Sequence, residues 1–504
     1  MKITYTGHAG LFIETQDCKI LCDPWLHSNP AFFKSWYVYP PNEESVDWEN
    51  IQKEVTHLYV SHVHRDHFDE SYLIGLFSER PDVQVILPDY KYADLEQRFI
   101  DIGAEEFLRE GHHGNKVGET FLKTFVCETI DREREDSALL VIDNHQSFLN
   151  INDSKILPEH KEWIDTYLPS FQCGIDMMAC QASGASYYPN SYNYDMLVKK
   201  EKCDLHRDRT IERFMKIKEE LDVKKSIVTA GPPIILDEHM THLNHYGDNA
   251  SVFHDHWQVK EFDEDDSIFR VLPGDTFEFD TIEDRIEGPD KEEFIYENQK
   301  HNTYTSLGDR DLYDSAKFVF LTTMDNIMSK SKWLKKHIVE KLYLQVEGYD
   351  SFRFDFKNGL IVEEPVKRSG MFYVITMPSR VFIEIQEDGI TDWEEAFLSM
   401  RCTFERSPDK YNPMIVGFFR NLQIDKLNRI KDSVEDTSIL DETFNLNGCE
   451  VQRYCPHQYY DLKHHGKVSE DGKELTCLGH GWTWSLQDGE GINTRSKICI
   501  KNQS

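Results

Sequence analysis

The residues best suited to chemistry stand in one short stretch, Ser61-His62-Val63-His64-Arg65-Asp66-His67-Phe68-Asp69. It follows an apolar run, residues 56–60, that is typical of a buried strand, so the histidines should lie where this strand ends and a loop begins. Side chains alternate in an extended segment, and we therefore expect His62 and His64 to share one metal ion. Asp66 and His67 should follow in the turn and face a second metal position. The stretch thus predicts a metal site that uses all four side chains.

Other parts of the chain offer candidates to complete this site. Asp153 follows a predicted strand that should end at the same sheet edge, which suits a bridging or capping ligand, although a helix N-cap is the alternative. Asp131 lies in a charged loop where a third histidine ligand of the first metal would be expected but is absent. Asp131 is the candidate for that place. Two histidines and one carboxylate suit iron(II) with open positions for oxygen and substrate. An ordinary solvated loop is the alternative for Asp131. Of His239, His242 and His245, His239 is the best candidate for a further metal ligand.

Two residues near the amino end and one later loop are expected to surround the metals. His8 lies in a glycine-flanked turn and is a candidate for the wall of the pocket, with a turn histidine bonded to backbone as the alternative. Asp23 ends a strand before a proline and is expected to orient the metal histidines. Ser183, Ser186 and Tyr187 follow an apolar strand in a small-residue loop, where backbone amides can approach a substrate closely.

The composition excludes several classes of partner. The 504 residues contain 56 lysines and arginines against 90 aspartates and glutamates, a formal net charge of −34, so we expect no nucleic-acid partner and no membrane surface, both of which are polyanionic. The chain starts with an alternating strand and has no apolar run long enough to span a membrane, which favours a cytoplasmic location. Its 11 cysteines are scattered, and we interpret most of them as reduced core thiols.

A second group of metal ligands stands near the carboxyl end, in Cys455-Pro456-His457 and Cys477-Leu478-Gly479-His480. Two cysteines and two histidines in this order resemble a Rieske centre, in which the cysteines hold one iron of a [2Fe–2S] cluster and the histidines hold the other. A tetrahedral zinc site uses the same ligand types and is the alternative. The glycines and the Gly481-Trp482-Thr483-Trp484 tail favour the Rieske interpretation.

The pattern of strands and helices predicts three domains: 1–286, a layered α/β domain with a mixed sheet that holds the metal site; 287–430, an α+β accessory domain; and 431–504, an all-β Rieske domain after a linker at 431–442. In the first domain we expect a strand at 83–87, helices at 92–102 and 197–223, and a hairpin of strands 137–142 and 146–150. In the second we expect a helical stretch at 309–339 and strands at 341–346, 352–356, 371–376 and 380–385.

The histidine stretch resembles the signature of the metallo-β-lactamase superfamily, whose αββα sandwich holds one or two metals at the sheet edge. Several softer segments resemble the CMP-N-acetylneuraminate hydroxylase branch and its bacterial relatives: residues 150–153, 183–186, 272–276, 393–395 and 401–409. The resemblance spans roughly residues 1–425. The chain departs from that branch in carrying the Rieske motif at its carboxyl end and Asp131 where a histidine would be expected.

The resemblance implies a Rieske-type non-heme iron monooxygenase that uses O2 to hydroxylate a small polar metabolite. An electron-donor protein (a ferredoxin, a cytochrome b5-like protein or a flavin reductase) would reduce the cluster, and the electron would pass to a mononuclear iron at His62, His64 and Asp131. A metal-dependent hydrolase with an appended iron–sulfur domain is the alternative, because most proteins with this motif hydrolyse their substrates. A redox sensor or electron carrier is a third class. Assembly into a homo-oligomer is left open.

Overall fold

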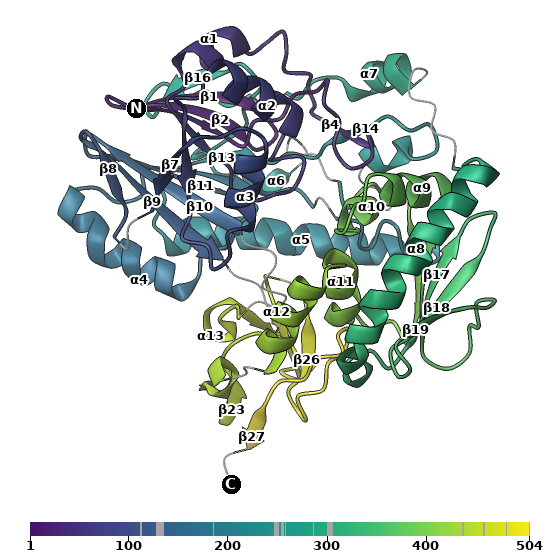
Figure 1. Ribbon diagram of the computed structural model, residues 1–504. Coiled ribbons are helices and arrows are strands. Elements are labelled where there is room, and N and C mark those ends of the chain that lie inside the picture. Colours follow the sequence, from purple (N-terminus) through teal and green to yellow (C-terminus); the bar gives the residue numbers. More distant parts are fainter. Residues whose placement is uncertain are drawn as a thin grey trace. The chain divides into compact units, whose positions relative to one another are not determined.

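The computed structural model describes residues 1–110, 113–127, 136–184, 186–245, 251–253, 257, 259–285, 287–299, 306–435, 438–456, 459–479 and 481–502. Two compact units contain them (Figure 1). The first is built from Met1–Cys127, Glu135–Ala185 and Lys200–Asn302, and the second from Ser186–Lys199 and Thr303–Ser504.

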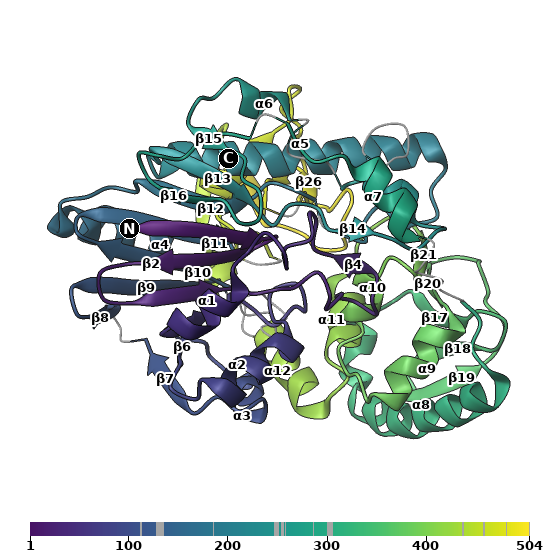
Figure 2. The same ribbon diagram turned by 90° about the horizontal axis from the view of Figure 1, so that it is seen from above.

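Two seven-stranded sheets form the centre of the first unit (Figures 1 and 2). In spatial order, one contains β16 (Thr276–Glu278), β1 (Lys2–Gly7), β2 (Gly10–Glu14), β3 (Lys19–Cys22), β5 (His57–Tyr59), β6 (Gln84–Leu87) and β7 (Glu106–Arg109). The other contains β15 (Ile268–Phe269), β13 (Lys225–Thr229), β12 (Met177–Gln181), β11 (Gln146–Asn152), β10 (Asp136–Asp143), β9 (Thr120–Cys127) and β8 (Asn115–Val117). The predicted hairpin of β10 and β11 is confirmed.

Three hydrophobic clusters separate the layers of this unit. One joins the inner faces of the two sheets and includes Ile13 and Phe148. A second packs the outer face of the first sheet on α1 (Trp48–Glu54), α2 (Glu70–Glu79) and α3 (Asp94–Asp101). A third packs the other sheet on α4 (Pro158–Tyr167), α5 (Met196–Glu220) and α6 (Lys260–Asp263). The result is the predicted αββα sandwich, in which each sheet buries both of its faces.

Strand pairing brings distant residues to one edge of this sandwich. Strands β3 and β5 are parallel with Cys22 opposite Tyr59, so Asp23 and the histidine stretch leave the sheet side by side. Strands β10 and β11 are antiparallel, and their register, Leu139 opposite Asn150, places the start of β10 beside the end of β11. Residues at these strand ends can therefore meet although they lie far apart in the sequence.

The second unit contains a five-stranded sheet, in the order β19 (Leu360–Glu363), β18 (Ser351–Asp355), β17 (Lys341–Val346), β20 (Phe372–Met377) and β21 (Thr403–Ser407). Helix α8 (Arg310–Lys330) packs through Phe320 on Phe352 of the sheet and on Phe382. The strand predicted at 380–385 is wrong, because these residues lie in α9 (Ser379–Glu387). Val381, Phe382 and Ile385 are apolar at helical spacing, and burial against α8 outweighs their preference for strands.

The carboxyl-terminal part of the second unit is built mainly from short strands. One three-stranded sheet contains β22 (Thr443–Leu446), β23 (Cys449–Gln452) and β27 (Ile500–Asn502), and the other β24 (Gly466–Val468), β25 (Glu474–Cys477) and β26 (Thr483–Ser485). The predicted linker is partly helical, since α12 (Ile424–Glu435) and a 3-10 turn at Ser438–Asp441 occupy most of it. The small β-rich character predicted for this segment is confirmed.

No helix in the described ranges is both long and apolar enough to cross a membrane. Most of the cysteines of the first unit are buried, among them Cys22, Cys127 and Cys180. Burial raises the pKa of the Cys127 thiol to about 11 and that of Cys180 to about 12, so both remain protonated at neutral pH. These cysteines agree with the prediction of reduced core thiols.

Candidate active site

The histidine stretch bends instead of continuing its strand. Strand β5 ends at Tyr59, and the backbone N–H groups of His67 and Phe68 both donate to the carbonyl of His64, at 3.0 and 2.7 Å. This turn carries His67 back toward His62, and their ring centroids lie 4.2 Å apart. Alternation along an extended strand therefore accounts for the proximity of His62 and His64, whose ring centroids lie 4.6 Å apart, but not for that of His67.

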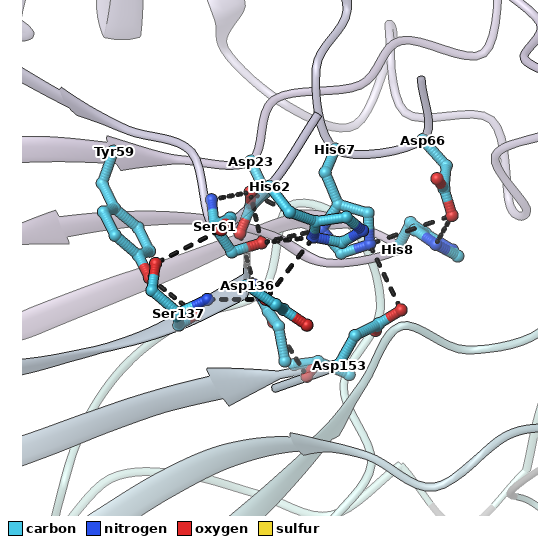
Figure 3. Close-up of polar contacts among 12 residues, drawn as sticks. His8, Asp23, Tyr59, Ser61, His62, Asp66, His67, Asp136, Ser137 and Asp153 are labelled. Carbon is cyan, nitrogen blue, oxygen red and sulfur yellow. Dashed lines mark hydrogen bonds and ion pairs between the residues drawn. The ribbon is translucent and has the colours of Figure 1, made fainter. Parts of the chain in front are cut away.

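Two overlapping groups of side chains can each hold a metal ion (Figure 3). In one group, ligand atoms of His62, His67 and Asp153 all lie within 4.8 Å of one another; in the other, those of His8, Asp66 and His67 do. His67 belongs to both groups. Imidazole nitrogen and carboxylate oxygen suit zinc or iron(II), so the donor set itself is compatible with either metal.

Unsatisfied polar atoms within these groups support metal binding. His67 Nε2, Asp66 Oδ1 and Asp153 Oδ1 are buried and have no hydrogen-bond partner. Buried polar atoms in native proteins nearly always have a partner, because an unmade hydrogen bond there costs about 1–3 kcal/mol. A metal ion bound by these atoms would remove that cost, and the residues present therefore fit a metal.

Asp23 and Ser61 contact the Nδ1 atoms of His67 and His62. Asp23 is fully buried; its carboxylate accepts hydrogen bonds from the backbone N–H of Ser61 at 2.8 Å, from the Ser61 hydroxyl at 3.0 Å, and from the Asn152 amide. Asp23 Oδ1 also lies 3.5 Å from Nδ1 of His67, on the ring side opposite Nε2. The Ser61 hydroxyl is 3.0 Å from Nδ1 of His62. These contacts orient both rings, as predicted for Asp23 from the sequence.

We expect the substitution Asp23→Asn to weaken metal binding by about 10- to 100-fold, because it removes the charge that orients and polarises the His67 ring. Equilibrium dialysis of iron(II) or zinc against the purified chain measures the change. Asp69→Asn is the matched control, since the Asp69 carboxylate is also buried but bonds Asn29 and the backbone of Tyr72. Equal affinities in the two variants would contradict the orienting role of Asp23.

Without a bound metal, His67 holds a proton at neutral pH. Burial alone would lower the pKa of His67, but the neighbouring carboxylates, Asp66 first, raise it to about 10. Burial would raise the pKa of Asp66, yet the charge of His67 and the hydrogen bond with His8 hold it well below its usual range. His67 and Asp66 are therefore an ion pair at neutral pH when no metal is bound.

A metal must displace this proton, because only a deprotonated nitrogen can bind it. We expect about one proton to be released per metal bound between pH 7 and 9, and the apparent affinity to rise about tenfold per pH unit over that range. Calorimetry in two buffers that differ in ionisation enthalpy measures the released proton. Metal binding without proton release would show that His67 is not a ligand.

Three further residues were predicted as metal ligands from the sequence. His64 is half-buried, with its ring centroid 4.6 Å from that of His62 and 6.0 Å from that of Phe32, but it belongs to neither group. His239 is exposed and also belongs to neither group among the described residues. Asp131 lies outside the residues that the structure describes. Their roles as ligands stay predictions.

The residues predicted to bind substrate have internal contacts. Ser183 is buried in the first unit, and its hydroxyl donates to the carbonyl of Ala230. In the second unit, Tyr187 is buried against Phe397 and Phe404, and the Ser186 hydroxyl accepts the backbone N–H of Tyr188 at 3.1 Å. Substrate binding by these three residues stays a prediction.

The cysteines predicted to bind the cluster begin two loops of the same design. The backbone N–H of Cys455 donates to the carbonyl of Tyr460, and the backbone N–H of Tyr459 donates to the carbonyl of Cys455. In the second loop, the backbone N–H of Cys477 donates to the carbonyl of Trp482, and the backbone N–H of Gly481 donates to the carbonyl of Cys477. Both cysteines are fully buried.

The two cysteine loops lie against each other. Gly479 packs so closely on the Tyr460 ring that a Cβ would come within 2.8 Å of it. Paired loops that each present a buried cysteine fit a shared cluster. His457 and His480 lie outside the described residues, so their roles stay predictions.

Sequence reasoning missed three residues of the site. Asp136 Oδ1 lies 3.6 Å from Nδ1 of His62. The Ser61 hydroxyl and the Asn152 amide donate hydrogen bonds to the Asp23 carboxylate. Asp136 begins β10, and its place beside the end of β11 follows from the hairpin register. Extending the predicted strand 137–142 by one residue, to Asp136, would have brought this carboxylate toward the site. No pattern in the sequence predicted the hydrogen bonds of Ser61 and Asn152 with Asp23.

Three family models match the chain in separate segments. A model described as Beta-lactamase superfamily domain matches residues 2–127, one described as Rv3818-like, SCP2-like domain matches 320–436, and one described as Rieske [2Fe-2S] domain matches 442–503. The matched segments follow one another without overlap.

Relatives cover the whole chain or most of it. A Mycolicibacterium smegmatis protein, named for a Rieske 2Fe-2S iron–sulfur group, is 28% identical over 530 residues and covers 98% of both chains. The cytidine monophosphate-N-acetylneuraminic acid hydroxylase of Asterias rubens is 20% identical over 459 residues, or 84% of this chain and 65% of its own length. The solved structure of CmlA, a diiron beta-hydroxylase from Streptomyces venezuelae, is 15% identical over 45% of this chain and 44% of its own, with a TM-score of 0.31.

Proposed function

The chain combines a metallo-β-lactamase domain with a carboxyl-terminal Rieske domain, and from this combination we propose that it is a Rieske-dependent, O2-using monooxygenase. Its substrate is a small polar metabolite, and its reductant is an external electron-donor protein. A cytoplasmic location belongs to the same proposal. The sequence relationship to a named hydroxylase supports the reaction class.

The observation that supports this proposal is the presence of two separate sets of candidate metal ligands in one chain. One set gathers around His67 at the edge of the sandwich, and the other begins at Cys455 and Cys477. A hydrolase needs only the first set, whose metal activates water. A paired-loop cluster site gives the chain a means of accepting electrons, which hydrolysis does not use.

Iron bound in the first set would supply oxygen activation, and a [2Fe–2S] cluster bound in the second would supply electrons one at a time. The protein residues prepare the first set for this task. Asp23 and Ser61 fix the ring orientations, and burial of His62, Asp66 and His67 keeps bulk water away from the ligand atoms. Asp153 is partly exposed and marks the side from which the site can be reached.

A hydrolase of the metallo-β-lactamase superfamily remains the alternative, favoured by the family model matched to residues 2–127. Oxygen uptake by the purified full chain separates the two functions. We expect bound iron, acid-labile sulfide, and oxygen consumption that requires a reductant and rises with substrates found by metabolite screening. Product formation without reductant or oxygen would establish the hydrolase, and electron transfer without any turnover would establish a redox carrier.

A further inference from the structure

Two segments of the second unit meet along a short stretch of backbone: the SCP2-like segment, residues 320–436, and the Rieske segment, residues 442–503. Tyr411 of the first forms a parallel bridge with Thr494 of the second. The backbone N–H of Tyr411 donates to the carbonyl of Asn493 at 2.8 Å. The backbone N–H of Arg495 donates to the carbonyl of Tyr411 at 2.9 Å. The two stretches therefore pair as neighbouring strands do.

Side chains from both segments reinforce this pairing. Arg495 Nε lies 2.9 Å from Glu340 Oε1, and the Glu340 side chain is only 4% exposed. Glu340 Oε2 also accepts a hydrogen bond from the Asn412 amide at 3.0 Å. The Lys410 ammonium donates to the carbonyl of Gly491. Because water screens a buried carboxylate weakly, we expect this contact to hold the two segments together.

The side chain of Asn493 continues the contact into the second cysteine loop. Its amide nitrogen donates to the carbonyl of Gly481 at 2.7 Å, and its amide oxygen accepts the backbone N–H of Thr483 at 2.9 Å. The backbone N–H of Gly481 donates in turn to the carbonyl of Cys477 at 2.7 Å. One side chain thus bonds both ends of the turn that follows Cys477, while its own carbonyl accepts the N–H of Tyr411.

Trp482, which lies within this turn, packs on the SCP2-like segment. Its ring centroid lies 5.6 Å from that of Tyr411, and its side chain is buried. Its carbonyl accepts the backbone N–H of Cys477 at 2.8 Å. The loop that presents Cys477 is therefore supported by packing as well as by hydrogen bonds.

We propose that Asn493 is a positioning residue for the iron–sulfur cluster and that residues 410–412 of the SCP2-like segment are its support. The support holds the loop at Cys477 in one conformation, so the Rieske segment receives and passes on electrons from a fixed place on the SCP2-like segment. Hydrogen bonding and solvent exposure around a cluster set its reduction potential, so the support also tunes the cluster. This inference rests on the cluster of the proposed function, but not on oxygen activation.

The first test uses the purified full chain with its cluster, without oxygen or substrate. Asn493→Ala removes both side-chain bonds to the turn. We expect it to speed amide hydrogen exchange in the peptide from Cys477 to Thr483, and loss of the cluster to a chelator, by about tenfold. Arg495→Met removes the ion pair with Glu340 without touching the turn, and should speed both rates by a smaller factor. Mass spectrometry and the visible spectrum measure the two rates.

Lys497→Met is the matched control for Arg495→Met. Lys497 also pairs with a carboxylate, that of Glu490, but both side chains are exposed and lie within the Rieske segment. This variant should change neither rate. Equal rates in Arg495→Met and Lys497→Met would overturn the support, and rates in Asn493→Ala equal to those of the unmodified chain would overturn the role of Asn493.

A second test measures the reduction potential of the cluster. Asn493→Asp keeps the acceptor for Thr483 and adds a negative charge beside the loop, which should lower the potential because it disfavours the added electron. Asn445→Asp is the control, since Asn445 is an exposed residue of β22 that bonds the N–H of Gly448. Equal potentials in the two variants would contradict the proposal. The expected pattern in a chain that never consumes oxygen would reject the monooxygenase and keep the support.

Discussion

Replacing Cys455 by serine is expected to abolish the iron–sulfur cluster and oxygen-dependent turnover, and to leave metal at the His67 groups. Cys455 is fully buried at the start of one of the two paired loops, so its thiolate cannot be replaced by a neighbouring residue. Serine has nearly the same shape but is a poor ligand for iron in such clusters. Acid-labile sulfide, the visible and electron paramagnetic resonance spectra, and reductant-driven oxygen uptake measure the three effects.

Cys499→Ser is the control for Cys455→Ser, because Cys499 lies in the same small domain but is exposed and stands outside the cluster motif. This variant should keep cluster and turnover. If Cys455→Ser retains turnover at the level of the unmodified chain, electron delivery through the cluster is wrong. Loss of metal from the His67 groups in Cys455→Ser would instead indicate general misfolding, which circular dichroism detects.

The second large effect is expected from His67→Ala, which should lower metal affinity at the sandwich edge by more than about 100-fold and abolish turnover. His67 is fully buried and is the one residue that belongs to both ligand groups. Its removal therefore disables both candidate metal positions, whereas loss of His62 or His8 disables only one. Metal analysis after dialysis, together with acid-labile sulfide, should show a chain that keeps its cluster and lacks the other metal.

His145→Ala is the control for His67→Ala, because His145 is exposed at the turn between β10 and β11 and contacts the carbonyl of Phe171. It should change neither metal content nor turnover. Full metal content and unchanged metal affinity in His67→Ala would contradict the role of His67 as a ligand of both groups.

Local spacing in the sequence predicted a large part of both candidate metal sites. The candidate ligands His62, Asp66 and His67 lie within six residues, and Cys455 and Cys477 stand in a recognisable Rieske pattern. His62, Asp66 and His67 are brought together by a single turn, so their proximity needs no knowledge of distant contacts. Cys455 and Cys477 stand on two loops, and the packing of Gly479 on Tyr460 brings these loops together. The pattern of apolar residues likewise located β6, β10, β11, β17, β18 and β20, and the predicted fold class is confirmed.

Only the tertiary structure decided which side chains share a ligand position. The turn at His64 brought His67 against His62, in addition to His64, whose ring centroid lies 4.6 Å from that of His62. Asp136 met the site because it begins a strand paired with β11, and His8 met Asp66 from 58 residues away. Strand register and the packing of two sheets fix these contacts, and both arise from burial summed over many residues. Residues 380–385 likewise lie in a helix, in which Phe382 packs on Phe320 of α8, although their apolar, β-branched side chains had predicted a strand.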